Sequence, residues 1–438
     1  MTTTKRHPYN ILCALLLILA VCAGSARSQA MMQMHMIPGI TNTTLSLTAT
    51  DGYVSTGEGN SIYFWGLAHG TDSVQYPAPT IIAAQGSTLN ITVNNQLTVP
   101  VSLVFPGQIG VVASGGNPGA ITREAQPGGS VSYSFTATHA GTYAYHSGTQ
   151  PDLQIEMGLT GAIIVRPTNA TGVVEMQAYN SPDTMFDHEF LFFLTEMDDT
   201  VHTLVEQGRM DEVDSATWWP VYWFINGRTG PDTMLEPFVS WLPTQPYNCM
   251  PMFHPGQKVL MRVIGGGRDP HPLHHHGNNS DVIACNGRML ESTPGAGPDL
   301  ARSVFTLPAS PGETMDSIFM WTGEKLGWDV YGHSSTNDPL EPNEYTPDHG
   351  KPFPVVLPND QSLTFGMHYG GSPFLGLPGN LPPGEGGFNP NNGYMFMWHS
   401  HNEKEICNNN VFLGGMMTMA MIEAYPSTNA MPMGAVTP

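Results

Sequence analysis

The sequence predicts an all-β protein made of two β-sandwich domains, and three observations support this. Glycine and proline are abundant, at 48 and 38 of 438 residues, so turn residues interrupt the chain at short intervals. The segments between them are short, rich in β-branched and aromatic residues, and often alternate polar with apolar positions. Helical periodicity is hard to find. Short alternating segments separated by turns are typical of β-sandwiches.

The strand candidates each carry one buried face, because successive side chains of a strand point to opposite sides. The segment 190–194 is instead apolar throughout, which indicates a strand buried on both faces. Residues 200–209 are expected to hold one or two helical turns. The clearest alternating candidates are residues 88–93, 131–135, 161–165 and 258–263.

The first thirty residues have the features of a secretory signal peptide. Lys5 and Arg6 precede an apolar run over residues 11–23, and small residues offer cleavage points up to Ala30. We therefore expect export to the periplasm, the cell surface or the extracellular space. No later stretch reaches the roughly 18 apolar residues of a spanning helix, so we expect no membrane span. Lipid anchoring at Cys22 stays open.

The rest of the chain is long enough for two domains. Residues 168–172 resemble a linker after the strand candidate at 161–165, and a new unit starts near His188. A stretch rich in proline, glycine and asparagine predicts long loops inserted in the second unit. The expected divisions are 1–30 for the signal peptide, 31–167 for domain 1, 168–425 for domain 2 with a loop-rich insertion at about 337–390, and 426–438 for a flexible tail.

Charge and cysteine content limit the partners and the covalent links of the chain. The formal charge is −21, with 15 Lys plus Arg against 36 Asp plus Glu, so no basic surface is available for nucleic acid. We therefore expect no nucleic-acid partner. Cys249, Cys285 and Cys407 follow the signal, and their odd number leaves the disulfide pairing open.

The strongest chemical signal is a histidine-rich segment, Asp-Pro-His-Pro-Leu-His-His-His-Gly, at residues 269–277. On an extended strand His274 and His276 point to one side and His275 to the other. Trp-His-Ser-His at 398–401 repeats this spacing after an aromatic segment. Neutral imidazoles bind copper or zinc, so each pair supplies half of a metal site.

A third motif, Gly-Thr-Tyr-Ala-Tyr-His-Ser at residues 141–147, contains one histidine, which is typical of a structural residue as well as of a ligand. Together with Gly-Gly-Met at 414–416, the motifs resemble three of the four copper motifs of multicopper oxidases and laccases. Segment 76–95 and Phe-Ile-Asn-Gly at 224–227 resemble further strands of that family, which extends the likeness over nearly the whole chain. The resemblance implies Greek-key cupredoxin sandwiches of the two-domain branch, whose copper sites are completed across a homotrimer.

Under this resemblance, copper is the cofactor. His271 aligns with a ligand of the electron-entry (type 1) copper, and Met416 aligns with the axial position of that copper. The remaining histidines of the motifs align with ligands of the oxygen-reducing cluster. Catalytic residues beyond these ligands are unknown. The predicted metal ligands are His146, His271, His274, His276, His399 and His401.

The sequence also departs from the family pattern. Ser400 stands where the type 1 cysteine belongs, and Glu405 or Val411 where its second histidine belongs. Gly148 replaces a cluster histidine, and residues 99–107, where the first copper motif should lie, contain none. The resemblance therefore implies one or more copper ions and not the full complement of four.

Three functions follow, and whether the chain is an enzyme stays open. The first is an oxidoreductase that uses a reduced set of copper ligands on a small-molecule or metal-ion reductant, with O2 as a further partner. The second is a non-catalytic copper-binding or copper-buffering protein, and the third is a structural envelope protein on the same scaffold. A methionine cluster at 31–36 is a candidate for Cu(I) capture, whereas the run at 416–421 is expected to form a buried strand.

Overall fold

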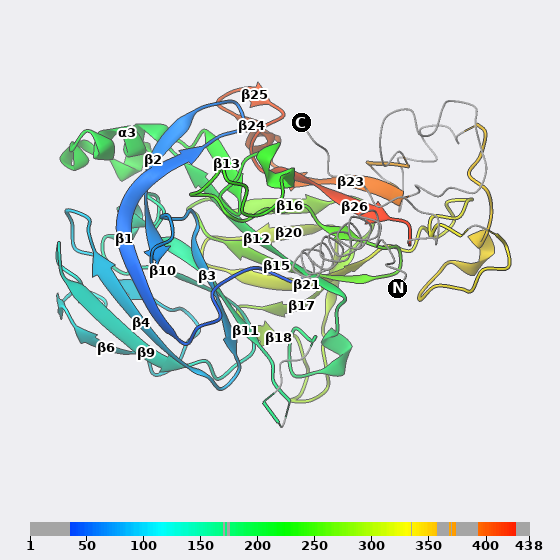
Figure 1. The fold of residues 1–438 in the computed structure, drawn as a ribbon, viewed down its shortest axis with the longest axis horizontal. Helices are drawn as coiled ribbons and strands as arrows, with labels where there is room; N and C mark the ends of the chain where they lie inside the picture. Colours follow the sequence, from blue (N-terminus) through cyan, green and yellow to red (C-terminus); the bar gives the residue numbers. More distant parts are fainter. Residues whose placement is uncertain are drawn as a thin grey trace, which may run out of the picture. The chain divides into compact units, whose positions relative to one another are not determined.

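The computed structural model describes residues 36–169, 171–172, 176–333, 335–356, 368, 370–373 and 393–425 (Figure 1). The predicted signal peptide, nearly all of the methionine cluster at 31–36, the predicted tail at 426–438 and most of the second half of the insertion lie outside these residues. The chain divides into two compact units, Met1–Pro38 and Gly39–Pro438, and all contacts given below belong to the second. Among the described residues, no helix is long and apolar enough to cross a membrane.

Two sheets built from residues 44–166 share one core. One has the strand order β2-β1-β4-β9-β6 and the other β3-β11-β10-β5. Leu45 and Ile91 of the first sheet pack in one cluster with Tyr145 and Ile163 of the second. The strands are β1 (Thr44–Ser55), β2 (Ser61–His69), β3 (Ala78–Ala84), β4 (Thr88–Asn95), β5 (Leu103–Val104), β6 (Val112–Gly115), β9 (Ser130–Thr136), β10 (Gly141–Ser147) and β11 (Thr160–Arg166), with the pair β7 (Asn117–Pro118) and β8 (Arg123–Glu124) beside them.

Two further sheets follow from residue 188 onward, ordered β13-β12-β15-β21-β17-β18 and β14-β26-β23-β16-β20. Phe192 and Val263 of the first share a core with Leu273 and Trp398 of the second. Their strands are β12 (His188–Met197), β13 (Tyr222–Ile225), β14 (Met252–Phe253), β15 (Lys258–Gly265), β16 (His271–His275), β17 (Ser280–Cys285), β18 (Arg288–Met289), β19 (Arg302–Val304), β20 (Thr306–Ala309), β21 (Thr314–Met320), β22 (Gly371–Ser372), β23 (Gly393–Ser400) and β26 (Met417–Glu423), with the pair β24 (Cys407–Asn408) and β25 (Val411–Phe412).

Helices are short. In α3 (Asp199–Glu206) the Asp198 side chain accepts a hydrogen bond from the Thr200 backbone, which satisfies one of the unpaired N–H groups of the first turn. This helix confirms the helical turns expected at 200–209. The others are α2 (Pro151–Gln154) and the 3₁₀ helices η1 (Pro182–Thr184), η2 (Met210–Glu212), η3 (Ser215–Thr217), η4 (Asp232–Met234), η5 (Thr346–Asp348) and η7 (Glu403–Ile406).

The prediction of an all-β fold with two sandwiches is confirmed. The alternating candidates form β4, β9, β11 and β15, and the apolar segment at 190–194 lies inside β12. The methionine run forms β26, although its core-facing residues are Ala420 and Ile422, with Met419 and Met421 only half-buried. The described part of the insertion consists mainly of turns and loops. The domain boundaries stay a prediction.

A buried charge network joins the two sandwiches. Arg262 on β15 is fully buried and its Nε donates to Glu189 on β12 at 2.9 Å, while Arg166 at the end of β11 contacts the same carboxylate. Arg262 also lies 3.7 Å from Asp316 on β21, which accepts a 2.5 Å hydrogen bond from Thr142 of β10. Each buried charge therefore has an opposite partner, and the partners come from both sandwiches.

We predict that Arg262→Met lowers the free energy of unfolding by about 3–5 kcal/mol, because breaking a buried ion pair leaves an uncompensated charge behind. Urea unfolding followed by intrinsic fluorescence measures this. Arg209→Met is the matched control, since Arg209 pairs with Glu212 on the exposed surface and should leave the unfolding midpoint almost unchanged. Equal midpoints for the two variants would contradict the prediction.

Candidate metal centre

The register between β16 and β23 places four histidines on one face. The strands are antiparallel, with His274 directly opposite His399, and the His401 backbone N–H donates to the Pro272 carbonyl at 2.8 Å. Because side chains alternate along a strand, His276 and His401 share the face of that central pair.

The four imidazole rings lie next to one another. The His274 ring centroid is 4.8 Å from that of His276, 5.6 Å from that of His399 and 4.7 Å from that of His401. The His276 and His399 centroids are 5.1 Å apart, and their Nε2 atoms are separated by 3.3 Å. We call these four residues the histidine face. The two His-x-His motifs, which are 123 residues apart in the chain, are thus brought together.

Backbone carbonyls contact three of the rings. Nδ1 of His274 lies 2.8 Å from the Phe305 oxygen, Nδ1 of His399 lies 2.6 Å from the Ser400 oxygen, and Nδ1 of His276 lies 3.4 Å from that of Gly370. A carbonyl can only accept, so the close Nδ1 atoms of His274 and His399 donate, and the Nε2 atoms of these rings keep their lone pairs when the rings are neutral. This pattern of an N–H held by a carbonyl is typical of metal-binding histidines.

The rings of His274, His276 and His399 favour the neutral form. Burial lowers the pKa of His276 to about 4, despite the opposing effect of the Gly370 carbonyl. Burial likewise lowers the pKa of His274 and of His399. His401 lies at the open side, with its side chain 47% exposed and its Nδ1 3.3 Å from the Glu403 carboxylate. The histidine face thus offers three buried imidazoles and one accessible imidazole as metal ligands. Such a set fits an imidazole-binding metal such as copper.

The opposite side of the two strands holds the histidine face in place. As predicted, His275 points away from the other rings, and it packs against Phe319 and Trp398 of the core. The Trp398 indole donates to the His276 carbonyl at 3.0 Å. Gly277 has a positive φ of 106°, and a Cβ there would lie 2.9 Å from the Phe396 ring, so glycine is required directly after the motif.

His271 does not join this face. It lies on the interior side of β16, fully buried, with Nε2 2.7 Å from Glu196 and Nδ1 2.9 Å from Glu405. Because both partners are carboxylates, both nitrogens donate and the ring is an imidazolium. Burial alone lowers the pKa of His271, but the two carboxylates outweigh it and raise this pKa to about 9. In this arrangement both ring nitrogens of His271 face carboxylates, and its role as a metal ligand stays a prediction.

The sequence pointed to one of the two partners of His271 but not to the other. Glu405 occupies one of the two positions where the family pattern has the second type 1 histidine. Glu196 belongs to none of the motifs. Glu196 also accepts the Arg268 backbone N–H at 2.5 Å, and burial raises its pKa. Met416, at the expected axial position, is buried beside Glu405 and donates its backbone N–H to the Glu405 carbonyl at 2.7 Å.

His146 lies in the first sandwich, at the end of β10. Its Nδ1 is 2.9 Å from the Ser147 carbonyl. His399 makes the same kind of contact with the carbonyl of the residue that follows it, Ser400. Among the described residues, the structure records no ring contact between His146 and the histidine face. The three cysteines Cys249, Cys285 and Cys407 are free thiols, so none of the pairings left open by the sequence forms.

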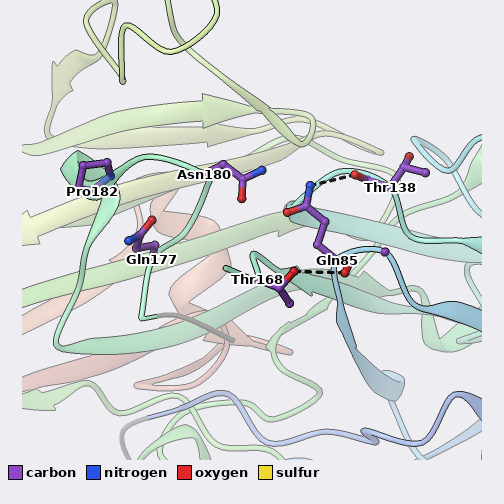
Figure 2. Close-up of a pocket in the computed structure, with 7 residues that line it drawn as sticks. Gln85, Thr138, Thr168, Gln177, Asn180 and Pro182 are labelled. Carbon is purple, nitrogen blue, oxygen red and sulfur yellow. Dashed lines mark hydrogen bonds between the residues drawn. The ribbon is translucent and has the colours of Figure 1, made fainter. Parts of the chain in front are cut away.

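A separate surface pocket carries no candidate ligand. It is lined by Gln85, Thr138, Thr168 and Gln177 among others, and Figure 2 shows the Gln85 amide donating to the Thr138 carbonyl at 3.0 Å. The lining residues are neutral and lie between the first sandwich and the segment leading to the second. We therefore place the chemistry at the histidine face and not in this pocket.

Comparison with known proteins finds similarity to multicopper oxidases in the first sandwich and to their fold over most of the chain. Residues 71–170 match the multicopper oxidase family model. A multicopper oxidase of Cercospora beticola is 37% identical over 91 residues, which cover 20% of this chain and 14% of that protein. Laccase 1 of Metarhizium guizhouense is 35% identical over 95 residues, covering 21% and 15%. The chain thus aligns with about a seventh of the length of these relatives.

Solved structures share the fold over most of the chain. The blue copper oxidase of Nitrosomonas europaea superposes with a TM-score of 0.54 at 18% identity, covering 86% of this chain and 85% of that one. The multicopper oxidase mgLAC gives a TM-score of 0.54 at 16% identity, with 88% of each chain covered. These similarities confirm the prediction of two cupredoxin-like Greek-key sandwiches.

The fold is that of cupredoxin-like proteins, and the histidine face carries the imidazole nitrogens that copper accepts. Residues 71–170 thus resemble part of a multicopper oxidase, and the curated relatives and solved structures that this chain resembles are multicopper oxidases and laccases. Copper is the cofactor of multicopper oxidases, and the lone pairs of the histidine face fit it.

The buried His271 imidazolium predicts a loss of stability at alkaline pH. Its pKa of about 9 in the folded protein exceeds the ordinary 6.5, so its contribution is complete below pH 6.5 and disappears as the pH rises through 9. The shift corresponds to about 3 kcal/mol. Urea unfolding at pH 6, 7.5 and 9.5 tests this.

The variant His271→Gln should lose this part of the pH dependence, since glutamine does not titrate. A wild-type stability that stays constant from pH 6.5 to 9.5, or a variant with the same slope as wild type, would contradict the assignment of an imidazolium at this position.

Proposed function

We propose that the chain is an exported copper-binding protein of the multicopper oxidase superfamily that lacks the type 1 copper cysteine. Copper would be held by His274, His276, His399 and His401. The observation that carries this proposal is the convergence of four imidazoles on one strand face, with three Nδ1 atoms engaged by carbonyls. Such a preorganised set needs little rearrangement to bind a metal.

We further propose that a second copy of the chain completes the site with His146, in a homotrimer. The histidine face is open at His401, and Phe305 beside His274 is 61% exposed. On the first sandwich, Ile121 is 64% exposed and precedes Thr122, which lies close to Gly148 near His146. Exposed apolar groups beside both half-sites favour a head-to-tail contact between copies, which closes into a ring.

Bound copper would supply one-electron redox chemistry between a small-molecule or metal-ion reductant and O2. The chain's own residues would hold the ion, fix the ring orientations through the carbonyls of Phe305 and Ser400, and leave an approach at His401. Oxidoreductase activity with this reduced ligand set is the first candidate function.

Copper binding without turnover is the second candidate, and the interior side of the same strands favours it. Ser400 is buried there and has no thiolate to offer, while Glu196 and Glu405 occupy both nitrogens of His271. A His₂Cys electron-entry site needs a thiolate and two imidazoles. Without them, electrons would have to reach the histidine face directly from the reductant.

We predict that the protein produced with copper retains the metal and that His274→Ala combined with His399→Ala loses it. Copper per chain, measured by plasma mass spectrometry, and electron spin resonance give the readout. His69→Ala, on the surface of the first sandwich, is the control and should bind as wild type does. Unchanged copper content in the double variant would refute the ligand assignment.

The role of His146 is testable separately. His146→Ala is expected to lower copper content or affinity by about 10-fold or more, because it removes one ligand supplied across the subunit contact. Light scattering should report a trimer for the wild type. A monomer whose copper affinity is unaffected by His146→Ala would contradict the shared site.

Oxygen uptake with a phenolic donor separates the two candidates. Turnover that disappears in the His274→Ala, His399→Ala double variant supports the oxidoreductase. Stoichiometric copper without oxygen uptake supports the buffering function. An absorption band near 600 nm would contradict the loss of the type 1 site in either case.

A further inference from the structure

A second group of metal-binding side chains lies outside the histidine face, in the loop that follows β21. It consists of Asp329, His333, Glu344 and His349, each of which offers one ligand atom within 4.8 Å of the others. Their side chains are 5%, 6%, 2% and 14% exposed. We call these four residues the loop cluster. Two imidazoles and two carboxylates are thus almost completely removed from water.

Short contacts connect the four members. His333 Nδ1 lies 2.5 Å from Asp329 Oδ2, and His349 Nδ1 lies 2.8 Å from Glu344 Oε1. His333 Nε2 is 3.8 Å from Glu344 Oε2, and the two imidazole centroids are 4.3 Å apart. Each imidazole therefore faces a carboxylate, and a proton in each contact occupies a place that a metal ion could take.

The charge of Glu344 is not balanced by lysine or arginine in the recorded contacts of the described residues. Both recorded ion-pair partners of Glu344 are histidines, within the part of the chain that the structure describes. Lys351, two residues after His349, pairs with Asp348 instead, at 2.8 Å. A divalent cation would neutralise the Glu344 carboxylate, which the neighbouring lysine does not contact, together with that of Asp329.

The dimensions suit a small cation. Zinc binds imidazole nitrogens and carboxylate oxygens at about 2.0–2.2 Å, so the ligand atoms of a tetrahedral site lie about 3.3–3.6 Å apart. The ligand atoms of the loop cluster all lie within 4.8 Å of one another. Shifts of about 1 Å would therefore complete the shell. Rotation of Glu344 or His349 can supply them, because both sit on the turn around η5.

The backbone around the cluster is already ordered. Asp329 Oδ1 accepts from the Tyr331 and Gly332 backbone N–H groups, and Oδ2 accepts from Gly350 at 2.7 Å. The Tyr331 ring stacks on Tyr425 with an interplanar angle of 5° and belongs to the core of the second sandwich. The loop cluster is therefore fixed on the sandwich and does not depend on an exposed loop alone.

We propose that the loop cluster is a second, structural metal site that takes a divalent cation of the zinc type. The ion links the arm at residues 329–333 to the arm at residues 344–349 and closes the loop between them. Two imidazoles with two carboxylates form a donor set that zinc accepts in a closed tetrahedral site. This site is independent of the proposed copper function, because it shares no residue with the histidine face.

Calorimetric titration of the chelator-treated full chain with Zn²⁺ tests the proposal. We expect one zinc per chain to bind in the His274→Ala, His399→Ala double variant, where the histidine face is removed, and to raise the melting temperature. In that background His349→Ala and Glu344→Gln should each weaken zinc binding at least about 100-fold. Substitution by Co²⁺ should give the visible absorption of a tetrahedral site.

Glu341→Gln in the same background is the matched control, since Glu341 lies in the same loop and contacts Glu344 through its backbone. Its N–H donates to the Glu344 carboxylate at 2.9 Å and its carbonyl accepts the Glu344 N–H at 3.3 Å. It should bind zinc as the double variant does. Absence of zinc binding in the double variant, or equal affinity in His349→Ala and Glu341→Gln, would overturn the proposal. Circular dichroism of each metal-free variant confirms folding, and a failure to bind copper in the wild type would affect only the proposed function.

Discussion

The antiparallel register between β16 and β23 is the constraint on which the candidate copper site depends. With His274 opposite His399, the alternation of the pleat sends four imidazoles to one side and His271, His275 and Trp398 to the other. A shift by one residue would exchange the two sets and bury the ligands in the core. The aromatic contacts of Trp398 with Phe319 and His275 oppose such a shift, so core packing and metal geometry are specified by the same pairs.

The interior side of these strands shows how a protein can keep a fold while changing the content of one site. An electron-entry copper needs a thiolate, and Ser400 cannot supply one. His271 is instead held between Glu196 and Glu405 as a buried cation with two anionic partners. Under the proposed loss of the type 1 site, the proton of His271 supplies the positive charge that a metal would bring, and the hydrogen bonds of the ring stay satisfied.

The sequence was sufficient to predict the two sandwiches, β12 as a doubly buried strand and the shared face of His274 and His276, because all of these follow from local periodicity. The assignment of His271 as a metal ligand stays a prediction, and its motif carries no sign of the carboxylates that contact its ring across the core. Glu196 is 75 residues away on another strand and carries no local signal. His333 and His349 were missed for a similar reason: their partners meet only when two arms of an irregular loop come together.

The buried network of Arg166, Glu189, Arg262 and Asp316 has a consequence for how this chain could be divided. Arg166 belongs to the first sandwich and the other three to the second, with Thr142 of the first sandwich contacting Asp316. A fragment ending after β11 would present an unpaired guanidinium, and the remaining fragment would expose two carboxylates around one arginine. Replacing either half by a cupredoxin domain from another protein would therefore require that the new domain also carry the charged residues that pair with the half that is kept.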